Sequence, residues 1–308
     1  IVNLALARGM VGREKCGIMP IRGHSGVQGG GECGSEPDKF PGGFEVNEVN
    51  ARRFSNLWRH PVPSAPGLRV PQMIEAAHKG ELDFLYSIGG NLLETMPDRR
   101  FVSDALAQVP VRVHQDIVLN SSMLIDPSEL VILLPAQTRY EQRGGGTTTS
   151  TERRIRFTPE IPGHRIGETR PEWEIPCLIG RKAMPNGELL FPYGDTQIIR
   201  EEMSRVMPMY QGIEKLRKEG DALQWGGPYL FKGGQFSNMP DGRALFSVLE
   251  PPDRRASEGR FYLTTRRGKQ FNSMTFGSVD RLMGSKTREA IFISPEDAER
   301  LGLDDGAP

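Results

Sequence analysis

The sequence predicts an α/β protein organised around a parallel sheet, followed by a smaller region of β character. Three apolar segments of strand length occur at residues 83–88, 111–113 and 130–134. Segments of helical pattern stand before the first of them and between the first and second. Strands that alternate with helices at this spacing favour parallel pairing. From residue 259 onward, short apolar runs are separated by polar loops, which predicts further strands.

Proline and glycine mark where the predicted helices begin and end. Residues 2–9 have the pattern of the last turns of a helix that a glycine closes. Pro71 can begin a short helix that ends at Gly80, and a second short helix is expected over residues 101–107. The third strand, at residues 130–134, is apolar throughout and bounded by a proline, which predicts burial on both faces of the sheet.

Composition and charge are those of an ordinary globular protein. The chain has 308 residues, 37% of them hydrophobic and 25% charged, which is long enough to bury a sizeable core and to hold two domains. Lys plus Arg equal Asp plus Glu at 39 each, which argues against nucleic acid or a membrane surface as a partner. No apolar run reaches the roughly 18 residues of a membrane span, so no membrane insertion is expected.

The cysteines bear on the cellular compartment. Cys16, Cys33 and Cys177 form no C-x-x-C pair and support neither a disulfide framework nor a zinc site. This usage indicates a reducing compartment and predicts a cytoplasmic location. Cys33 lies among glycines and is expected to be a structural cysteine, with a reactive thiol as the alternative.

A glycine-rich stretch at residues 19–31 is the first candidate site. Five glycines lie between Gly23 and Gly31, and this density is typical of a loop that lies against a ligand. Arg22 precedes them, and its guanidinium can bind a carboxylate or phosphate through two parallel N–H donors. The alternative is a flexible surface loop with a solvated arginine.

Small and polar residues at the ends of the first two strands form a second candidate site. They are Gly89, Gly90, Asn91 and Thr95 after the first strand, and Gln115 and Asp116 after the second. Ligands of parallel sheets bind beyond the carboxyl ends of the strands. Small residues let phosphates approach the backbone, and a carboxylate accepts hydrogen bonds from a guanine edge or a ribose hydroxyl. The alternative is that these are ordinary turn residues.

The remaining segments predict structure more than chemistry. Residues 157–255 are rich in proline and glycine and contain a predicted helix over residues 196–218, whose apolar residues indicate a packing face. Strands are expected over residues 261–265 and 290–293, with a polar loop between them. A short capped helix beginning after Ser294 is expected next.

The stretch that begins at Cys16 reads C-G-I-M-P-I-R-G-H-S-G-V-Q-G. It resembles the N-P-V-R-G-Q-N-N-V-Q-G loop of molybdenum bis(pyranopterin guanine dinucleotide) oxidoreductases of the formate dehydrogenase type. The resemblance implies that Arg22 lies beside the molybdenum and orients the substrate anion. His24 stands where these enzymes usually carry glutamine, and a formate-dehydrogenase-like branch of uncertain substrate has R-G-H-S there. His24 could relay the substrate proton, because imidazole changes charge near neutral pH, or it could hold the loop.

The resemblance extends over nearly the whole chain and implies further cofactor contacts. The strand-end residues would hold the guanosine and phosphates of one pyranopterin dinucleotide, with Asn91 in place of an aspartate often found there. Residues 263–273 resemble the L-T-T-x-R-x-x-x-x-N-S pattern at the opening of a C-terminal double-psi β-barrel. The contacts implied there are Arg267, Gln270, Phe271, Asn272 and Ser273.

The resemblance also implies a multidomain subunit of which this chain is an internal fragment. Residues 1–24 would end a preceding α/β domain, and residues 25–140 would form the parallel-sheet domain that binds the pterin dinucleotide. Residues 141–255 would connect it to the barrel, which would begin within residues 256–308. The metal ligand and the cysteines of an iron–sulfur cluster would lie before Ile1.

The expected function is therefore two-electron oxidation of a small anion such as formate, at molybdenum or tungsten. Electrons would leave through the iron–sulfur cluster, and an electron-transfer partner would accept them. The cofactor supplies the redox chemistry, whereas the protein supplies orientation and electrostatics. The fragment alone is expected to be inactive. The alternative is a non-catalytic nucleotide-binding α/β module, which would keep the strand-end residues but have no use for Arg22.

Overall fold

A computed structural model of the chain describes residues 1–22, 24, 26–237, 239–251, 259–265, 279–280, 283–285 and 290–307. The helices are α1 Val2–Ala7, α2 Val27–Glu32, α3 Glu48–Trp58, α4 Val70–His78, α5 Leu92–Thr95, α6 Arg99–Gln108, α7 Glu174–Ala183, α8 Gly187–Leu190, α9 Thr196–Val206 and α10 Pro295–Leu301. The strands are β1 Lys39–Phe40, β2 Phe44–Glu45, β3 Phe84–Ile88, β4 Val111–Asp116, β5 Leu130–Pro135, β6 Gly146–Ser150, β7 Arg154–Thr158 and β8 Ala222–Gln224.

A parallel sheet in the order β3-β4-β5 confirms the predicted α/β architecture. Its strands and the helices α4 and α6 lie where the sequence predicts them, although β4 extends further, to Asp116. Pro71 stands in the first turn of α4, and Gly80 beyond its end takes a φ of +70°. The backbone preferences of proline and glycine therefore fix both ends of this helix.

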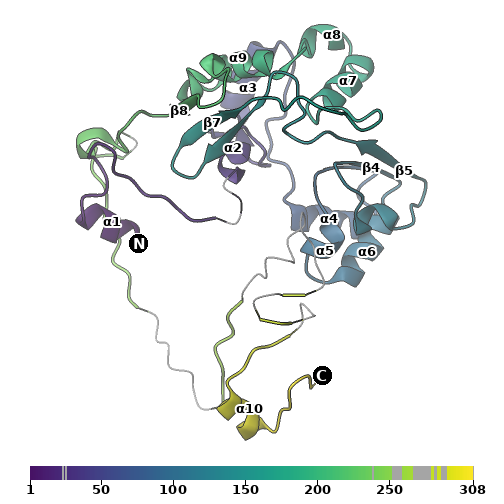
Figure 1. The fold of residues 1–308 in the computed structure, drawn as a ribbon, viewed down its shortest axis with the longest axis vertical. Coiled ribbons are helices and arrows are strands. Elements are labelled where there is room, and N and C mark those ends of the chain that lie inside the picture. The colour runs from purple at the N-terminus through teal and green to yellow at the C-terminus, as the bar shows by residue number, and fades with distance from the viewer. Residues whose placement is uncertain are drawn as a thin grey trace.

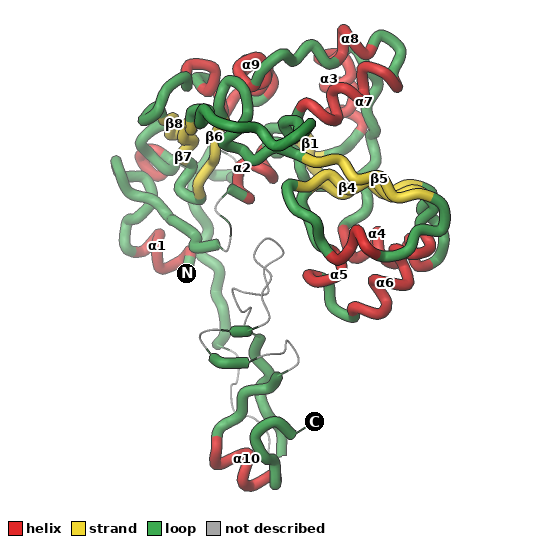
Figure 2. The backbone as a smooth tube through the Cα atoms, turned by 45° about the vertical axis from the view of Figure 1, so that its right-hand side comes forward, coloured by secondary structure: helices red, strands yellow, loops and turns green. Residues whose placement is uncertain are grey.

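Helices α4, α5 and α6 gather on one side of the sheet (Figures 1 and 2). The core on this side contains Ile74 and Ala77 of α4 and Val102, Ala105 and Leu106 of α6, and Leu85 of β3 packs against it. Arg112 pairs with Leu85 in the register, and His114 pairs with Ser87. Because side chains alternate between the two faces of a sheet, Arg112 and His114 share the helix-covered face with Leu85.

The predicted burial of the third strand on both faces is wrong, because the opposite face of the sheet is open at its two edge strands. Phe84, Ile88 and Ile132 are exposed there. Leu133 belongs to the helix-covered face but is 45% exposed, because β5 is an edge strand. Unbroken apolar strands are typical of sheets covered on both faces. Here the described residues cover the opposite face only at the central strand, where Val113 and Gln115 are buried.

A second core lies between α3, the antiparallel sheet β6-β7-β8 and the end of α9 (Figure 1). Phe54 of α3 stacks on Phe40 with ring centroids 4.7 Å apart, and both pack with Ile155 of β7 and Tyr210. Residues 40–58 thus pack with residues 155–216 across a long stretch of sequence. The division into residues 1–24, 25–140, 141–255 and 256–308 stays a prediction.

The predicted helix over residues 196–218 is too long. Helix α9 ends at Val206, and the 3₁₀ helices η2 Pro208–Tyr210 and η3 Ile213–Lys215 follow it. Pro208 has no backbone N–H and disfavours helical conformation in the residue before it, which explains the early end. The predicted packing face is confirmed at Val206, Met207 and Tyr210, which are buried.

The C-terminal part departs from the predicted strands. Residues 261–265 and 290–293 are described, but they form no regular strand, so those two predictions are wrong. A strand requires a neighbour for its backbone hydrogen bonds, and no pairing partner stands beside either segment in the described part of the chain. Arg267, Gln270, Phe271, Asn272 and Ser273 lie outside the described residues, and the double-psi barrel stays a prediction.

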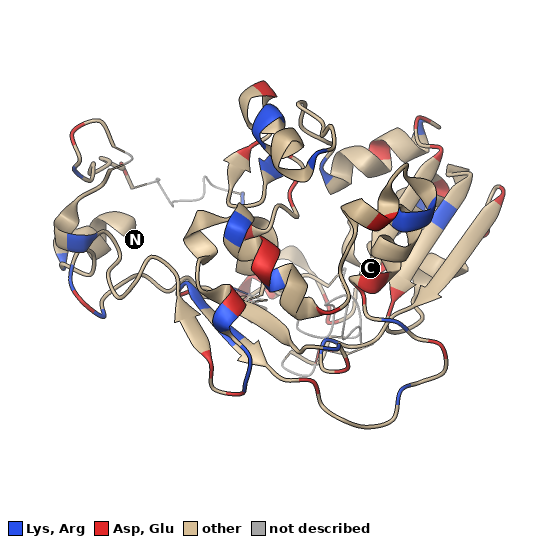
Figure 3. Cartoon of the chain, turned by 90° about the horizontal axis from the view of Figure 1, so that it is seen from above, with Lys and Arg blue, Asp and Glu red and all other residues tan. Residues whose placement is uncertain are grey.

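Helix α10 and the charge distribution agree with the sequence. Ser294 Oγ accepts a hydrogen bond from Asp297 N at 3.1 Å and caps α10. Lys and Arg are interspersed with Asp and Glu along the chain (Figure 3), in keeping with equal numbers of both signs. Among the helices of the described residues, none is long and apolar enough to cross a membrane.

Candidate functional site

The carboxyl ends of β3 and β4 meet, as the parallel topology predicts. Gly89 N donates to Gln115 O at 2.9 Å, and Gly89 takes a φ of +59°. This conformation favours glycine, which has no Cβ to clash. A Cβ built on Gly89 or Gly90 would meet no atom of the described residues within 4 Å. The strand end therefore has open space beside two positions that lack side chains.

Asp116 presents an oriented carboxylate at the end of β4. Its Oδ1 accepts a hydrogen bond from Ile117 N at 2.7 Å, and its Oδ2 accepts one from Asn120 Nδ2 at 3.1 Å. A carboxylate can accept about four hydrogen bonds. Asp116 is half-buried and can therefore accept further donors from a ligand while its position is fixed by the protein.

Asn91 is buried and bonded within the protein. Its Oδ1 accepts hydrogen bonds from Ser121 Oγ at 3.2 Å and from Ser122 Oγ at 2.7 Å, both in the 3₁₀ helix η1 Ser121–Leu124. Its backbone carbonyl accepts from Thr95 Oγ1 at 2.8 Å. Asn91 thus ties the end of β3 to η1, and Thr95 lies half-buried beside it.

Gln115 also forms hydrogen bonds within the protein, and one of them joins it to the segment around Glu172, a contact that the sequence does not predict. Its Oε1 accepts a hydrogen bond from Tyr86 Oη at 2.6 Å, and its Nε2 donates to the backbone carbonyl of Glu172 at 2.9 Å. Burial, and then the negative charge of Asp116, raise the pKa of the Glu172 carboxyl. A backbone hydrogen bond from Gln137 N to Arg170 O, at 2.8 Å, holds the segment that contains Glu172 against the end of the sheet. No sequence motif in residues 157–255 indicates this contact.

His114 is a second residue that sequence patterns do not single out. It is 2% exposed, and in the described part of the chain neither ring nitrogen has a hydrogen-bond partner. Burial, and then the positive charge of Arg112, lower its pKa, while Asp116 opposes them. Arg112 is fully buried on the same face and donates to Ser122 O at 3.1 Å and to Ile125 O.

The glycine-rich stretch is partly helical, which corrects the prediction of a loop. Residues 27–32 form α2, in which an added Cβ at Gly29 would lie 2.9 Å from Thr149 Oγ1. The glycines there allow close packing of α2 against β6. Arg22 and His24 are exposed in the irregular segment before α2, where Val27 N donates to His24 O at 3.4 Å.

Six of the predicted residues are therefore brought together at one edge of the sheet. They are Gly89, Gly90, Asn91, Thr95, Gln115 and Asp116. Arg22 and His24 belong to a separate segment of the chain. Among the described residues, no group of three or more His, Cys, Asp or Glu is arranged to hold a metal ion.

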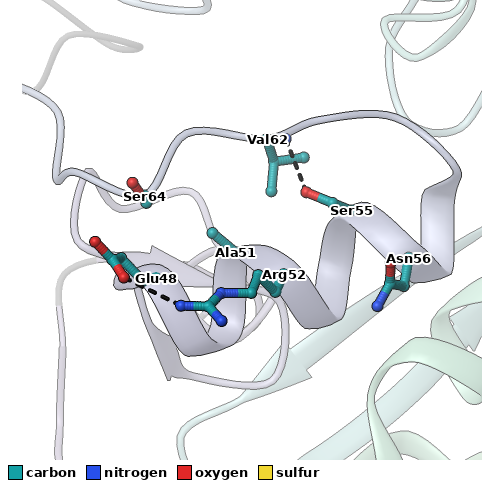
Figure 4. A pocket seen from close by; sticks show the side chains of 7 residues that line it. All are labelled: Glu48, Ala51, Arg52, Ser55, Asn56, Val62 and Ser64. Carbon is teal, nitrogen blue, oxygen red and sulfur yellow. Dashed lines mark hydrogen bonds and ion pairs between the residues drawn. The ribbon is translucent and has the colours of Figure 1, made fainter.

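Two surface hollows occur in the described part of the chain, and the second adjoins Asn91 through Ser121. The hollow in Figure 4 has a volume of about 400 Å³ and runs along α3, where Val62 N donates to Ser55 Oγ at 3.1 Å. The other, of about 480 Å³, lies beside α6 and η1. Neither hollow is lined by a residue of the predicted sites.

The sequence model of the family described as Molybdopterin oxidoreductase matches residues 1–182. This range is more than half of the chain and contains both the Arg22 stretch and the parallel sheet. The chain belongs to the molybdopterin oxidoreductase family. Membership implies a molybdopterin cofactor and confirms the resemblance found in the sequence.

Relatives of this molybdopterin oxidoreductase chain match it almost from end to end. The Probable oxidoreductase YjgC of Bacillus subtilis is 30% identical over 99% of this chain and 31% of its own length. The F420-dependent formate dehydrogenase 1 subunit alpha of Methanococcus maripaludis is 29% identical over 98% of this chain and 45% of its own length. The F420-dependent formate dehydrogenase subunit alpha of Methanocaldococcus jannaschii is 29% identical over 99% and 46%. The chain thus spans about a third to just under half of the length of these relatives.

Proposed function

We propose that the chain is part of a formate-dehydrogenase-like enzyme that oxidises a small anion such as formate by two electrons. The observation that carries this proposal is the family match over residues 1–182, which includes Arg22 and the strand-end residues together. Relatives named as formate dehydrogenase alpha subunits cover nearly all of this chain, which supports formate as the first substrate to test.

The strand-end residues fit a pyranopterin guanine dinucleotide. The open backbone at Gly89 and Gly90 leaves room for phosphates. Asp116 keeps acceptor capacity for the N–H groups of a guanine or for a ribose hydroxyl. We assign the buried Asn91 and Gln115 the task of holding this edge together, with Thr95 beside them. When bound, the molybdenum or tungsten cofactor would supply the two-electron chemistry.

Other parts of the proposal rest on the resemblance alone. Arg267, Gln270, Phe271, Asn272 and Ser273 would contact the cofactor from the double-psi barrel. An iron–sulfur cluster would pass electrons to a partner, and the enzyme would work in the cytoplasm.

Arg22 is proposed to orient the substrate anion. Its guanidinium can form two parallel hydrogen bonds with a carboxylate, whereas lysine offers a point charge. In the full-length subunit, Arg22→Lys should lower kcat/KM for formate by at least about tenfold while the metal content stays unchanged. Arg8→Lys, at an exposed position in the segment after α1, is the matched control and should keep the parent kinetics.

Unchanged kinetics of Arg22→Lys would contradict this role. They would favour a nucleotide-binding module, which needs the strand-end residues but not Arg22. Asp116→Ala separates the alternatives further, because it should release bound guanine nucleotide under either hypothesis but lower the metal content only in the enzyme.

A further inference from the structure

A buried tyrosine ties α2 to the second core. Tyr210, in η2, is 1% exposed, and its Oη donates a hydrogen bond to Glu32 Oε2. Thr149 Oγ1 lies 3.0 Å from Tyr210 Oη, and Gln28 Nε2 donates to Glu32 Oε1 at 2.5 Å. Glu32 is the last residue of α2, so this network connects the helix to β6 and to η2.

Helix α2 depends on such contacts because its own sequence disfavours a helix. It has six residues, of which Gly29, Gly30 and Gly31 are three. Glycine inside a helix is less favourable than alanine, and helices this short draw their stability from tertiary packing. The close approach of Gly29 to Thr149 fits the helix to β6. The carboxylate of Glu32 then sets its orientation.

Helix α2 follows directly on the segment that carries Arg22 and His24. The backbone bond from Val27 N to His24 O, at 3.4 Å, joins His24 to its first turn. A shift of α2 would therefore move the residues that precede it, including Arg22 and His24. We propose that Tyr210 and Glu32 are positioning residues for the Arg22–His24 segment, an inference that rests on the proposed substrate-orienting role of Arg22.

The ionisation of the neighbouring groups supports this assignment. Burial, and then the hydrogen bond to Glu32, raise the pKa of Tyr210, so its hydroxyl stays protonated and donates. Burial, and then the charge of Glu32, raise the pKa of the adjacent Cys33 thiol to about 11. The Tyr210 hydroxyl is thus the donor in this network, and Glu32 Oε2 is its acceptor.

The first test compares two tyrosine substitutions in the full-length subunit. Tyr210→Phe removes the hydroxyl that holds α2. Tyr193→Phe is the matched control, because Tyr193 also donates to a carboxylate, Glu202, and burial likewise raises its pKa. In hydrogen–deuterium exchange, the amides of residues 27–34 should exchange at least about tenfold faster in Tyr210→Phe. They should be unchanged in Tyr193→Phe.

The kinetic test uses the same variants with formate. Tyr210→Phe should lower kcat/KM by about tenfold, mainly through KM, with the metal content unchanged. Glu32→Gln keeps an acceptor for the Tyr210 hydroxyl and should stay within about twofold of the parent. Glu32→Ala should behave like Tyr210→Phe, and it replaces that variant in every measurement if the latter does not fold.

A double-variant comparison shows whether Tyr210 acts through Arg22. If it does, Arg22→Lys combined with Tyr210→Phe should be no slower than the slower single variant. Effects that multiply, or unchanged exchange in Tyr210→Phe, would overturn the positioning role while leaving the function of Arg22 intact. Unchanged kinetics of Arg22→Lys alone would instead overturn the proposed function, and the positioning role with it.

Discussion

His24 places an imidazole where formate dehydrogenases usually carry an amide, and this difference can be tested by pH. An imidazole that relays a proton gains and loses it during turnover, whereas an amide cannot. His24→Gln should therefore remove one inflection from the pH profile of kcat/KM in the full-length subunit. The exposed His164 is the matched control, and His164→Gln should leave the profile as it is. Identical inflections in His24→Gln and the parent would mean that His24 only holds the segment.

His114 predicts a pH dependence of stability. Its pKa is lowered in the folded protein, chiefly by burial and then by Arg112, while an unfolded chain titrates near the ordinary value of about 6.5. Below that pH the unfolded chain binds a proton that the folded protein does not. Stability is therefore retained above about pH 6.5 and falls as the pH drops through it, by up to about 1.4 kcal/mol per pH unit.

The measurement is the free energy of unfolding of the parent and of His114→Leu between pH 5 and 8. The difference between the two should shrink or reverse toward low pH, because only the parent carries the buried imidazole. His164→Leu should follow the parent, since an exposed imidazole stays hydrated when it is protonated. Parallel curves for the parent and His114→Leu would show that the buried imidazole does not cause the pH dependence.

Among the elements, the 3₁₀ helix η1 stabilises the strand-end residues of the candidate cofactor site through its hydrogen bonds to Asn91. Ser122 is fully buried, and its Oγ accepts from Leu93 N at 3.0 Å and donates to Asn91 at 2.7 Å. Ser122→Ala leaves both groups without this partner and should lower the free energy of unfolding by about 1–3 kcal/mol. Ser103→Ala, on the neighbouring helix α6, should change it by less than about 0.5 kcal/mol. Equal changes in the free energy of unfolding for the two substitutions, measured by urea denaturation, would show that the hydrogen bonds of Ser122 do not stabilise the fold as expected.

Elements whose ends depend on local backbone preference could be predicted from the sequence. Pro71 and Gly80 bound α4, and Ser294 caps α10, because these residues act on their immediate neighbours. Helix α2 could not be predicted, since its glycines disfavour a helix and only packing against Thr149 explains it. The exposure of β5 could not be predicted either, because an apolar strand does not reveal which of its faces is covered.

The candidate site shows the same division between local and distant information. The strand-end set around Asp116 follows from the parallel topology, which the strand pattern predicts. Glu172 and Tyr210 depend on contacts between distant segments. Tyr210 and Glu32 are 178 residues apart, and no spacing rule links them. The role of Arg22 came from a family motif rather than from its exposed position in the fold.

At the scale of the molecule, one hydrophobic core supports the proposed cofactor site and the other supports the proposed substrate-binding segment. The core beneath β3, β4 and β5 supports the strand-end residues, and the core around Phe54 and Tyr210 supports α2 and the segment before it. The chain covers only 31% of the length of the Bacillus subtilis relative and 45% of that of the Methanococcus maripaludis relative. Tests of activity therefore belong to the full-length subunit.

We expect the full-length protein to hold a metal-bearing pterin dinucleotide at the strand-end edge that contains Asp116. The decisive measurement is the content of molybdenum, tungsten and released guanine nucleotide in the purified parent and in Asp116→Ala. The parent should contain metal and guanine nucleotide together in stoichiometric amounts, and Asp116→Ala should lose both in parallel. Guanine nucleotide without metal in the parent, or metal and nucleotide retained in full by Asp116→Ala, would contradict this expectation.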